Sequence, residues 1–364
     1  MITNGLFVFR LSAVAVGLAA FVGTATAANL SPVEQLYADL YKLPAAERAQ
    51  KIEDGARKEG TISMITGLGG SLGTGHLKVI TDRYPWLKLV HTNMGSPDTV
   101  SRIVAEETAG KHLTDFANVA VPDLAQPLER NMLARYPTPA MARMEAKFKV
   151  YMDDPNENRW ASWAWTGHGI SYNPTMIKPE DAPKSWDDLC DPKHKGTVSF
   201  EPAEARFLIG LYLVMGEEKL QSWLECMARN EPIVMRGHTV RLQLMLAGDH
   251  AIQGDNFTYR GAWLNAQNPK KAPFTVVYTA EILAFADGTI INRNSQHPYA
   301  SAMLTDFNFS DEVQAYMAKN YRSPVIGPDP FMPNDFKLVA FNVVEQAVID
   351  RLFAMWNKTM GVRR

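Results

Sequence analysis

The stretch between residues 61 and 91 constrains the fold most, because its pattern is strand, glycine-rich turn, helix, strand. Residues 61–66 have an apolar, strand-like pattern, and residues 75–84 carry Leu77, Ile80 and Tyr84 at helical spacing. A second strand is predicted over residues 87–91, after the break at Pro85. Strands joined through a helix in this way run parallel in one sheet. The segment therefore predicts an α/β fold.

Strand-like and helix-like patterns keep alternating along the chain. After a helical lead-in over residues 31–59, we predict a helix that begins with Ser96 as its N-cap and ends at Gly110. Further strands are predicted over residues 115–121, 160–174 and 274–285. Further helices are predicted over residues 124–132, 204–215, 217–229 and 238–247 and through most of the chain from 298 onward.

This layout predicts two α/β lobes with mixed, mostly parallel sheets, for which 364 residues are ample. Two long extended segments, residues 164–172 and 276–285, are expected to cross between the lobes as hinge strands. We expect lobe 1 to comprise residues 29–165 plus 280–325, and lobe 2 residues 166–279 plus 326–364.

The N-terminus has the pattern of a secretory signal. Arg10 precedes an apolar run over residues 11–23 that is short for a bilayer span, and Ala25-Thr26-Ala27 resembles a cleavage site. We predict that residues 1–27 are a cleaved signal peptide, with an uncleaved anchor as the alternative, and that the mature protein is periplasmic. The formal net charge of −2 provides no basic field for binding nucleic acid.

The sequence contains two cysteines, Cys190 and Cys226. In an oxidising compartment they can form a disulfide, but two separate buried thiols are an equally open interpretation.

The glycine-rich turn contains Gly69-Gly70-Ser71-Leu72-Gly73, which fits the G-x-S-x-G elbow of serine hydrolases. The context argues against that motif, because residues 67–70 separate Ser71 from the strand, whereas a nucleophile elbow is a tight turn. A triad of Ser71, Asp255 and His297 has the right chain order, but many other residues would fit that order equally well.

Nucleotide motifs are also incomplete in this turn. A phosphate-binding P-loop needs a lysine where His76 stands, and no G-x-G-x-x-G is completed. Glycines between a strand and a helix still let backbone N–H groups face a bound solute. Since ligands of α/β sheets collect at the carboxyl ends of strands, the turn at Ser96 should face the same crevice. The candidate ligand-binding residues of the first lobe are Thr66, Gly69, Gly70, Ser71, Gly95 and Ser96.

Several segments resemble one known family. They read "ARKEGTISMIT", "GSPDTVSRIVAEE", "PKSWDDLCDPKHKGTVSF", "LAGDHAIQGDN" and "HPYASAMLTDFNFSDEVQAYM". With these segments, the chain resembles the periplasmic solute-binding proteins of ABC importers, in the bilobed group that contains the ferric-ion-binding proteins. The resemblance implies a type II-like fold with two crossover strands and closure of the lobes around a ligand. It also implies a monomer that delivers its solute to an ABC permease, without enzymatic activity or cofactor.

Ferric-binding relatives typically present two adjacent tyrosines to the metal, where this chain has Phe257-Thr258-Tyr259. A trivalent cation needs several anionic oxygen ligands, so the loss of one tyrosine weakens the case for iron, although Tyr259 and Tyr278 could still take part. Arginines in the expected cleft segments suit an oxyanion instead. These arginines are Arg102, Arg206, Arg236 and Arg241.

We therefore predict a small oxyanion-bearing solute, with ferric iron or a ferric chelate as the alternative and a secreted serine hydrolase using Ser71 as a remote one. Trp163 and Trp165 are candidates for an apolar wall of the pocket. The candidate ligand-binding residues of the second lobe are Glu201, Arg236, His238, Thr239, Asp255, Tyr259 and Tyr278.

Overall fold

The computed structural model describes residues 30–144, 158–202, 204–267, 275–277, 281–327, 337–341 and 344–361. The predicted signal peptide, residues 1–27, and Tyr278 lie outside the described residues. The chain divides into two compact units, Met1–Leu30 and Ser31–Arg364, and every helix and strand named below belongs to the second. Within the described ranges, no helix combines the length and the apolar character needed to cross a bilayer.

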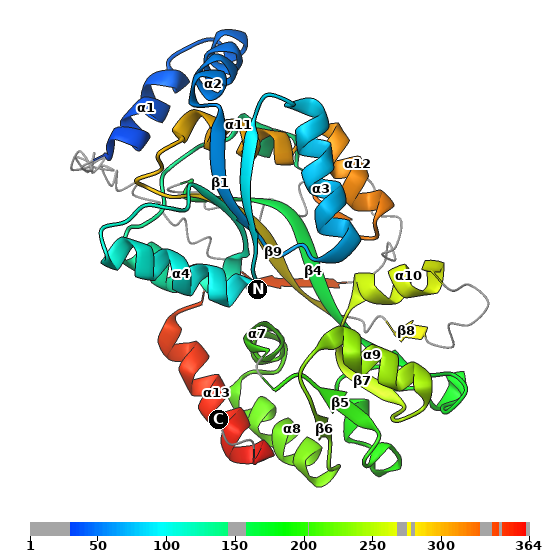
Figure 1. Cartoon of the computed structure of the whole chain (residues 1–364). Helices are drawn as coiled ribbons and strands as arrows, with labels where there is room; N and C mark the ends of the chain where they lie inside the picture. The colour runs from blue at the N-terminus through cyan, green and yellow to red at the C-terminus, as the bar shows by residue number, and fades with distance from the viewer. Residues whose placement is uncertain are drawn as a thin grey trace, which may run out of the picture. The chain divides into compact units, whose positions relative to one another are not determined.

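The first elements build one end of a mixed sheet (Figure 1). They are α1 (Pro32–Tyr41), α2 (Ala45–Glu59), β1 (Thr61–Thr66), α3 (Gly70–Arg83), β2 (Lys88–Asn93), α4 (Ser96–Thr108), β3 (Phe116–Ala120), η1 (Val121–Leu124), α5 (Ala125–Glu129) and η2 (Pro139–Arg143). Strand β1 pairs in parallel with both β2 and β3, which confirms the predicted strand–helix–strand unit.

Two long strands connect this end of the sheet to the other. β4 (Trp160–Tyr172) and β9 (Glu281–Ile291) pair antiparallel with each other, from Trp160 opposite Ile290 to His168 opposite Leu283. β9 continues the first half of the sheet by pairing with β3, and β4 begins the second half by pairing with β7. These are the two crossover strands of the fold (Figure 1).

The second end of the sheet carries its own strands and helices. They are η3 (Pro179–Asp181), η4 (Asp187–Cys190), η5 (Pro192–His194), β5 (Val198–Phe200), α7 (Ala205–Met215), α8 (Glu217–Arg229), β6 (Ile233–Val234), α9 (His238–Ala247), β7 (Ile252–Phe257) and α10 (Thr258–Gln267). β5 lies in parallel between β7 and β6. The predicted extended segment 274–285 is two strands, since β8 (Thr275–Val277) pairs with β4 apart from β9.

The last part of the chain is mostly helical, as expected, and adds two short strands. It comprises α11 (Pro298–Asn308), α12 (Asp311–Lys319), β10 (Ser323–Pro324), β11 (Lys337–Phe341) and α13 (Gln346–Met360). β10 pairs with β4, and β11 pairs in parallel with β9.

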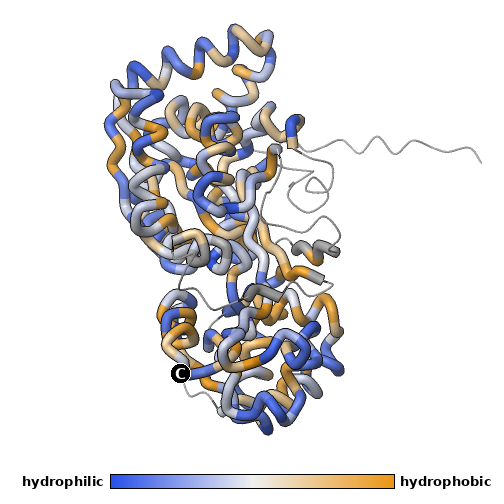
Figure 2. Tube along the Cα trace, turned by 90° about the vertical axis from the view of Figure 1, so that its right-hand side faces the viewer, coloured by the Kyte–Doolittle hydropathy of each residue, from blue (hydrophilic) through white to orange (hydrophobic). Residues whose placement is uncertain are grey.

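The buried side chains form two hydrophobic cores. The first includes Ile62, Phe116 and Trp163, and the second includes Phe200 and Trp356. Figure 2 shows hydrophilic and hydrophobic residues alternating along the helices, as expected of amphipathic helices packed on a sheet. The chain thus has the predicted two α/β lobes joined by two crossover strands. The exact lobe boundaries proposed above stay a prediction.

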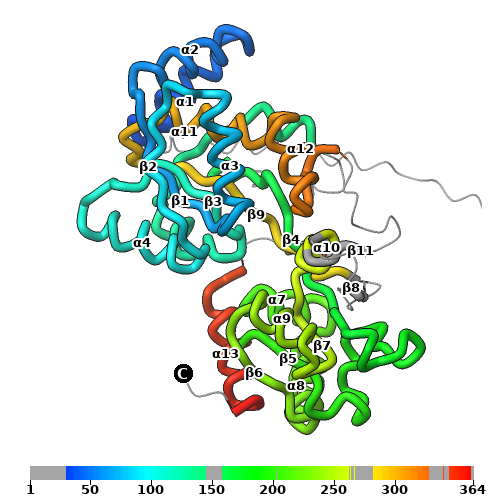
Figure 3. The backbone as a smooth tube through the Cα atoms, turned by 45° about the vertical axis from the view of Figure 1, so that its right-hand side comes forward, coloured from blue at the N-terminus to red at the C-terminus, as the bar shows by residue number. Residues whose placement is uncertain are grey.

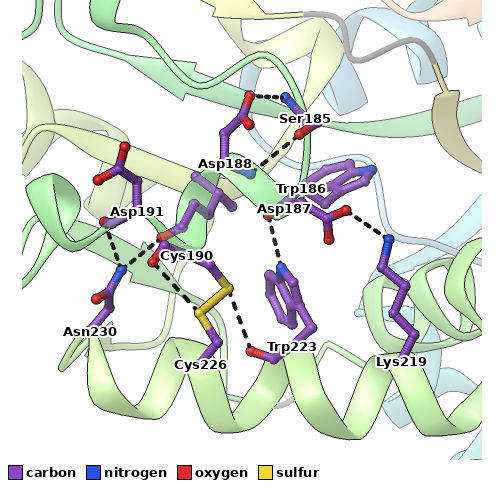
Figure 4. Close-up of a disulfide and its surroundings, with 11 residues drawn as sticks. Ser185, Trp186, Asp187, Asp188, Cys190, Asp191, Lys219, Trp223, Cys226 and Asn230 are labelled. Carbon is purple, nitrogen blue, oxygen red and sulfur yellow. Dashed lines mark hydrogen bonds and ion pairs between the residues drawn. A yellow bond between two sulfur atoms is a disulfide. The ribbon is translucent and has the colours of Figure 1, made fainter.

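Cys190 and Cys226 form a disulfide that joins η4 to α8, with their Cα atoms 5.7 Å apart (Figure 4). Beside it, the Trp223 indole donates a hydrogen bond to the Trp186 carbonyl at 2.8 Å. Asn230 donates to the carbonyls on both sides of Cys190. The disulfide therefore lies within a region of lobe 2 that hydrogen bonds also hold in place.

Two helices begin one or more residues before their predicted starts. Helix α3 begins at Gly70 rather than residue 75, and the Gly73 amide closes its first turn by donating to the Gly69 carbonyl at 3.3 Å. Gly70 itself adopts φ = 60°, a left-handed conformation that glycine tolerates. The N-cap of α4 is Gly95 rather than Ser96. The Ser96 hydroxyl does not cap its own helix, because it accepts a hydrogen bond from the Ala120 amide at 2.9 Å.

Candidate functional site

Two adjoining cavities open between elements of both lobes, and we call them together the cleft. The larger has a volume of about 360 Å³ and the smaller about 210 Å³. Figure 3 shows α3 and α12 in the upper part of the fold and α9 and α10 in the lower part, with β4 and β9 running from one part to the other. The larger cavity is lined by residues 67–72, Thr239, Tyr259, Arg260, Trp263, Asn320 and Arg322. The smaller one reaches Gly95, Ser96, Asn118, Trp163, Thr166, Arg206, Phe257, Phe285 and Asp287.

The turn between β1 and α3 forms the lobe 1 wall. It folds back so closely that a Cβ atom on Gly73 would lie 1.9 Å from the Leu68 carbonyl oxygen, so only glycine fits there. The Asn93 side chain holds the turn by donating to the Leu68 carbonyl at 2.6 Å. The N-caps of α3 and α4, Gly69 and Gly95, carry no side chain to cap the first helical turn. The positive ends of both helices therefore lie at this side of the cleft, whose lining includes Gly69, Gly70, Gly95 and Ser96.

Three arginines among the described residues line the cleft, and two of them are paired with carboxylates. Arg206 binds Glu204 through Nε at 2.7 Å, and its guanidinium lies 4.8 Å from the centre of the Phe285 ring. Arg322 binds Asp287 at 2.5 Å. Burial alone would raise the pKa of Glu204, but Arg206 and His238 outweigh it and hold that pKa well below its usual range.

Arg260 is the third of these arginines. It donates a hydrogen bond to the Thr239 hydroxyl, and no carboxylate of the described residues pairs with it. Its Nε atom is buried and has no hydrogen-bond partner in the described part of the chain. Arg260 therefore carries the positive charge that the lining of the cleft does not balance.

A buried polar network lies beneath the start of α9. Arg241 and Asp255 are both fully buried and pair at 2.5 Å. Asp255 also accepts a hydrogen bond from the Glu201 amide at 2.8 Å, and Glu201 accepts one from the Gly237 amide at 2.6 Å. His238 lies between Glu204 and Arg241. These groups hold the α9 N-terminus against β7, and the two cavities are lined by none of the three carboxylates, Glu201, Glu204 and Asp255.

Comparison with known families identifies the fold. The model of the bacterial extracellular solute-binding protein family matches residues 115–351. The chain belongs to this family. Among solved structures, the solute-binding protein is similar to iron-bound HitA from Pseudomonas aeruginosa, with 17% identity and a TM-score of 0.69 over 82% of this chain and 99% of that one. It is also similar to AfuA from Actinobacillus pleuropneumoniae with exogenous fructose-6-phosphate bound, with 19% identity and a TM-score of 0.71 over 84% and 99%.

A third similar structure is the spermidine/putrescine ABC transporter protein PotD from Streptococcus pneumoniae, in complex with calcium and HEPES. It has 16% identity and a TM-score of 0.65 over 82% of this chain and 99% of that one. No curated protein sequence matches. The matches confirm the resemblance to solute-binding proteins of ABC importers and their type II fold. Because the sequence identities are below 20%, the solved structures are evidence for the fold and not for the ligand.

The cleft of the solute-binding protein brings together part of the predicted site. Its lining includes Gly69, Gly70, Ser71, Gly95, Ser96, Thr239 and Tyr259. Of the two tryptophans, Trp163 lines the smaller cavity, whereas Trp165 is buried away from both.

The remaining candidates lie elsewhere. Thr66 is buried, with its hydroxyl 3.0 Å from the His91 ring. Arg236 is exposed and lines neither cavity, and Arg102 pairs with Glu106 on its own helix. The hypothetical triad is not assembled either, because His297 binds Asp115 at 2.7 Å and Asp255 binds Arg241.

Sequence reasoning missed several residues of the lining, among them Arg260, Trp263, Asp287 and Arg322. Arg260 was within reach, because it follows Tyr259 at the start of the helix after β7, where the strand-end rule applies. Arg322 follows a helix, and Asp287 lies inside a crossover strand, so no local pattern marked either.

Proposed function

We propose that the protein captures a small oxyanion-bearing solute in the cleft, after export to the periplasm, and delivers it to an ABC-type permease. The observation that carries the proposal is Arg260, a cation in the cleft that no carboxylate of the described residues balances. Family membership supports the transport role.

Charge pairing favours an anion as the ligand. The Arg206–Glu204 and Arg322–Asp287 pairs each have a net charge of zero. Arg260 keeps its positive charge, because no carboxylate of the described residues pairs with it. Guanidinium groups bind carboxylate and phosphate oxygens with two parallel hydrogen bonds. The starts of α3 and α4, which have no side-chain cap, add N–H donors and the positive ends of two helix dipoles, and both favour a negatively charged ligand.

Ferric iron fits the described lining less well. A trivalent ion needs several anionic oxygen ligands, and the described part of the cleft offers Tyr259 and an Asp287 already bound to Arg322. The guanidinium of Arg322 lies 4.3 Å from the centre of the Tyr259 ring. The described residues also include no group of three His, Cys, Asp or Glu side chains suited to a metal.

A thermal-shift screen tests the proposal. The purified protein is heated with sodium phosphate, sulfate, citrate or benzoate, and a bound anion at 100 times its Kd should raise the free energy of unfolding by about 2.7 kcal/mol. The Arg260→Gln variant should lose this stabilisation, and Arg236→Gln, which removes an exposed arginine outside the cleft, should keep it. Full retention of binding by Arg260→Gln would contradict the proposed site. A visible tyrosinate-to-iron absorption band after ferric loading would favour iron instead.

A further inference from the structure

We infer that the cleft recognises an organic monoanion with a planar apolar body, of the aromatic carboxylate class, through Arg260 and Trp263 acting together. The inference rests on the proposed function and adds the substrate class.

Trp263 is the first observation. The side chain lines the larger cavity and is 36% exposed, although six of the chain's other seven tryptophans are buried. An apolar ring left open at the wall of a cavity is a typical contact surface for the body of an organic ligand.

Arg260 and Trp263 are placed to bind one molecule. They are three residues apart on α10, which puts them on the same side of the helix. Arg260 also lies 5.4 Å from the centre of the Tyr259 ring. The helix thus presents a cation next to aromatic surfaces, which matches a carboxylate attached to a ring.

The opposite wall is also apolar near this pair. Leu68, from the turn after β1, and Leu72, from the first turn of α3, line the same cavity as Trp263. A flat apolar body in the cavity would therefore contact hydrophobic side chains from both lobes. A bare inorganic ion would leave these surfaces wet.

The size and charge of the cleft set the rest of the class. A volume of about 360 Å³ is within the range of pockets for small organic molecules and far exceeds an inorganic ion. One unbalanced arginine matches one negative charge, which a carboxylate supplies and a phosphate dianion exceeds.

Titration calorimetry with chosen probes tests the inference. Benzoate and 4-hydroxybenzoate carry both features, acetate has the carboxylate without the ring, and benzyl alcohol has the ring without the charge. At about pH 8, where the titrations are run, inorganic phosphate is mainly a dianion and has no ring. We expect the two aromatic carboxylates to bind at least about 10-fold more tightly than acetate, phosphate or benzyl alcohol, because ring contacts add to the ion pair.

Variants separate the two contacts. Trp263→Ala should weaken benzoate binding by about 10-fold and change acetate binding little, whereas Trp263→Phe should retain benzoate binding. Arg260→Gln should weaken both carboxylates, with Arg236→Gln as the matched control. The inference is overturned if phosphate binds as tightly as benzoate or if Trp263→Ala leaves benzoate affinity unchanged. Either result would leave the proposed function standing, whereas failure of every anion to bind would overturn both.

Discussion

Arg322 and Asp287 join lobe 1 to a crossover strand at the floor of the cleft. Arg322, which follows α12, donates to the Asp287 carboxylate on β9 at 2.5 Å. Thr166 on β4 donates to the same carboxylate at 2.9 Å and accepts from Arg322 at 3.1 Å. The ring of Tyr259, from lobe 2, also lies against the Arg322 guanidinium. Arg322 therefore contacts both crossover strands and lobe 2.

Breaking this pair should destabilise the protein. The side chains of Arg322 and Asp287 are 9% and 19% exposed, so Arg322→Gln would leave a nearly buried carboxylate without its partner. We expect the free energy of unfolding in urea to fall by about 3 kcal/mol, and the double variant with Asp287→Asn to recover part of it. Lys78→Gln, which breaks an exposed pair with Asp82, is the control and should change stability by less than about 0.5 kcal/mol. Equal losses of stability in Arg322→Gln and Lys78→Gln would contradict a buried, coupled Arg322–Asp287 pair.

Local patterns were enough to predict most of the fold. Strand–turn–helix alternation located β1, α7, α8 and α9, because periodicity and caps depend on neighbouring residues. The start of α3 was wrong because glycines were interpreted as loop, whereas Gly70 begins the helix. The split between β8 and β9 was missed because both segments are apolar and extended.

The cleft was harder to predict, because its chemistry depends on which charges are buried together. The glycine-rich turn indicated Ser71 and a predicted helix start indicated Thr239, whereas Tyr259 and Asp255 were chosen from the family resemblance. Asp255 is fully buried against Arg241, a pairing that the sequence does not mark as structural. A single chain shows which charged residues are near a strand end, but it does not show which of them already have partners.

Asp255 should therefore matter for stability more than for binding. Asp255→Asn removes the charge that pairs with the buried Arg241 and should lower the free energy of unfolding by about 3 kcal/mol or more. The anion affinity of the folded variant, measured by calorimetry well below its melting temperature, should stay within about 3-fold of that of the parent protein. A 3-fold change corresponds to a smaller binding free energy than a typical hydrogen bond contributes. A large loss of affinity at unchanged stability would instead return Asp255 to the ligand site.

The disulfide should stabilise lobe 2 without tuning the ligand. Cys190 and Cys226 are 36 residues apart in sequence, and closing a loop of that length contributes about 3–4 kcal/mol in the chain-entropy account. The Cys190→Ser/Cys226→Ser variant should thus unfold at lower urea concentration, and reducing agent should shift the parent protein similarly but leave the variant unchanged. Because neither cysteine lines the cleft, anion affinity should not change. A loss of affinity on reduction would show that η4 and α8 are coupled to the site.

His168 should make stability fall in mild acid. The ring is fully buried on β4 among Phe207, Phe257 and Phe285, and neither ring nitrogen has a hydrogen-bond partner in the described part of the chain. Burial lowers the pKa of His168 from 6.5 to about 4, with Glu204 and Asp255 opposing the shift and His238 and Arg206 adding to it.

The sign of the effect follows from proton binding. Between about pH 6.5 and pH 4 the unfolded chain binds a proton at this histidine that the folded protein does not, so the free energy of unfolding falls as the pH falls, by up to about 1.4 kcal/mol per pH unit. Asp306, whose pKa burial raises to about 6, acts in the opposite direction over part of this range, so the parent curve alone does not isolate His168.

The His168→Leu variant isolates the contribution, because it keeps an apolar side chain of similar size and removes the titrating ring. We expect the stability of the variant relative to the parent protein to rise steadily from pH 7 to pH 4.5 in urea titrations at each pH. Leu213→Gln changes an exposed side chain that does not titrate and is the control, for which the difference should stay nearly constant. If the free energies of unfolding of the two variants depended on pH in the same way, the pKa of His168 in the folded protein would not be lowered, contrary to the prediction.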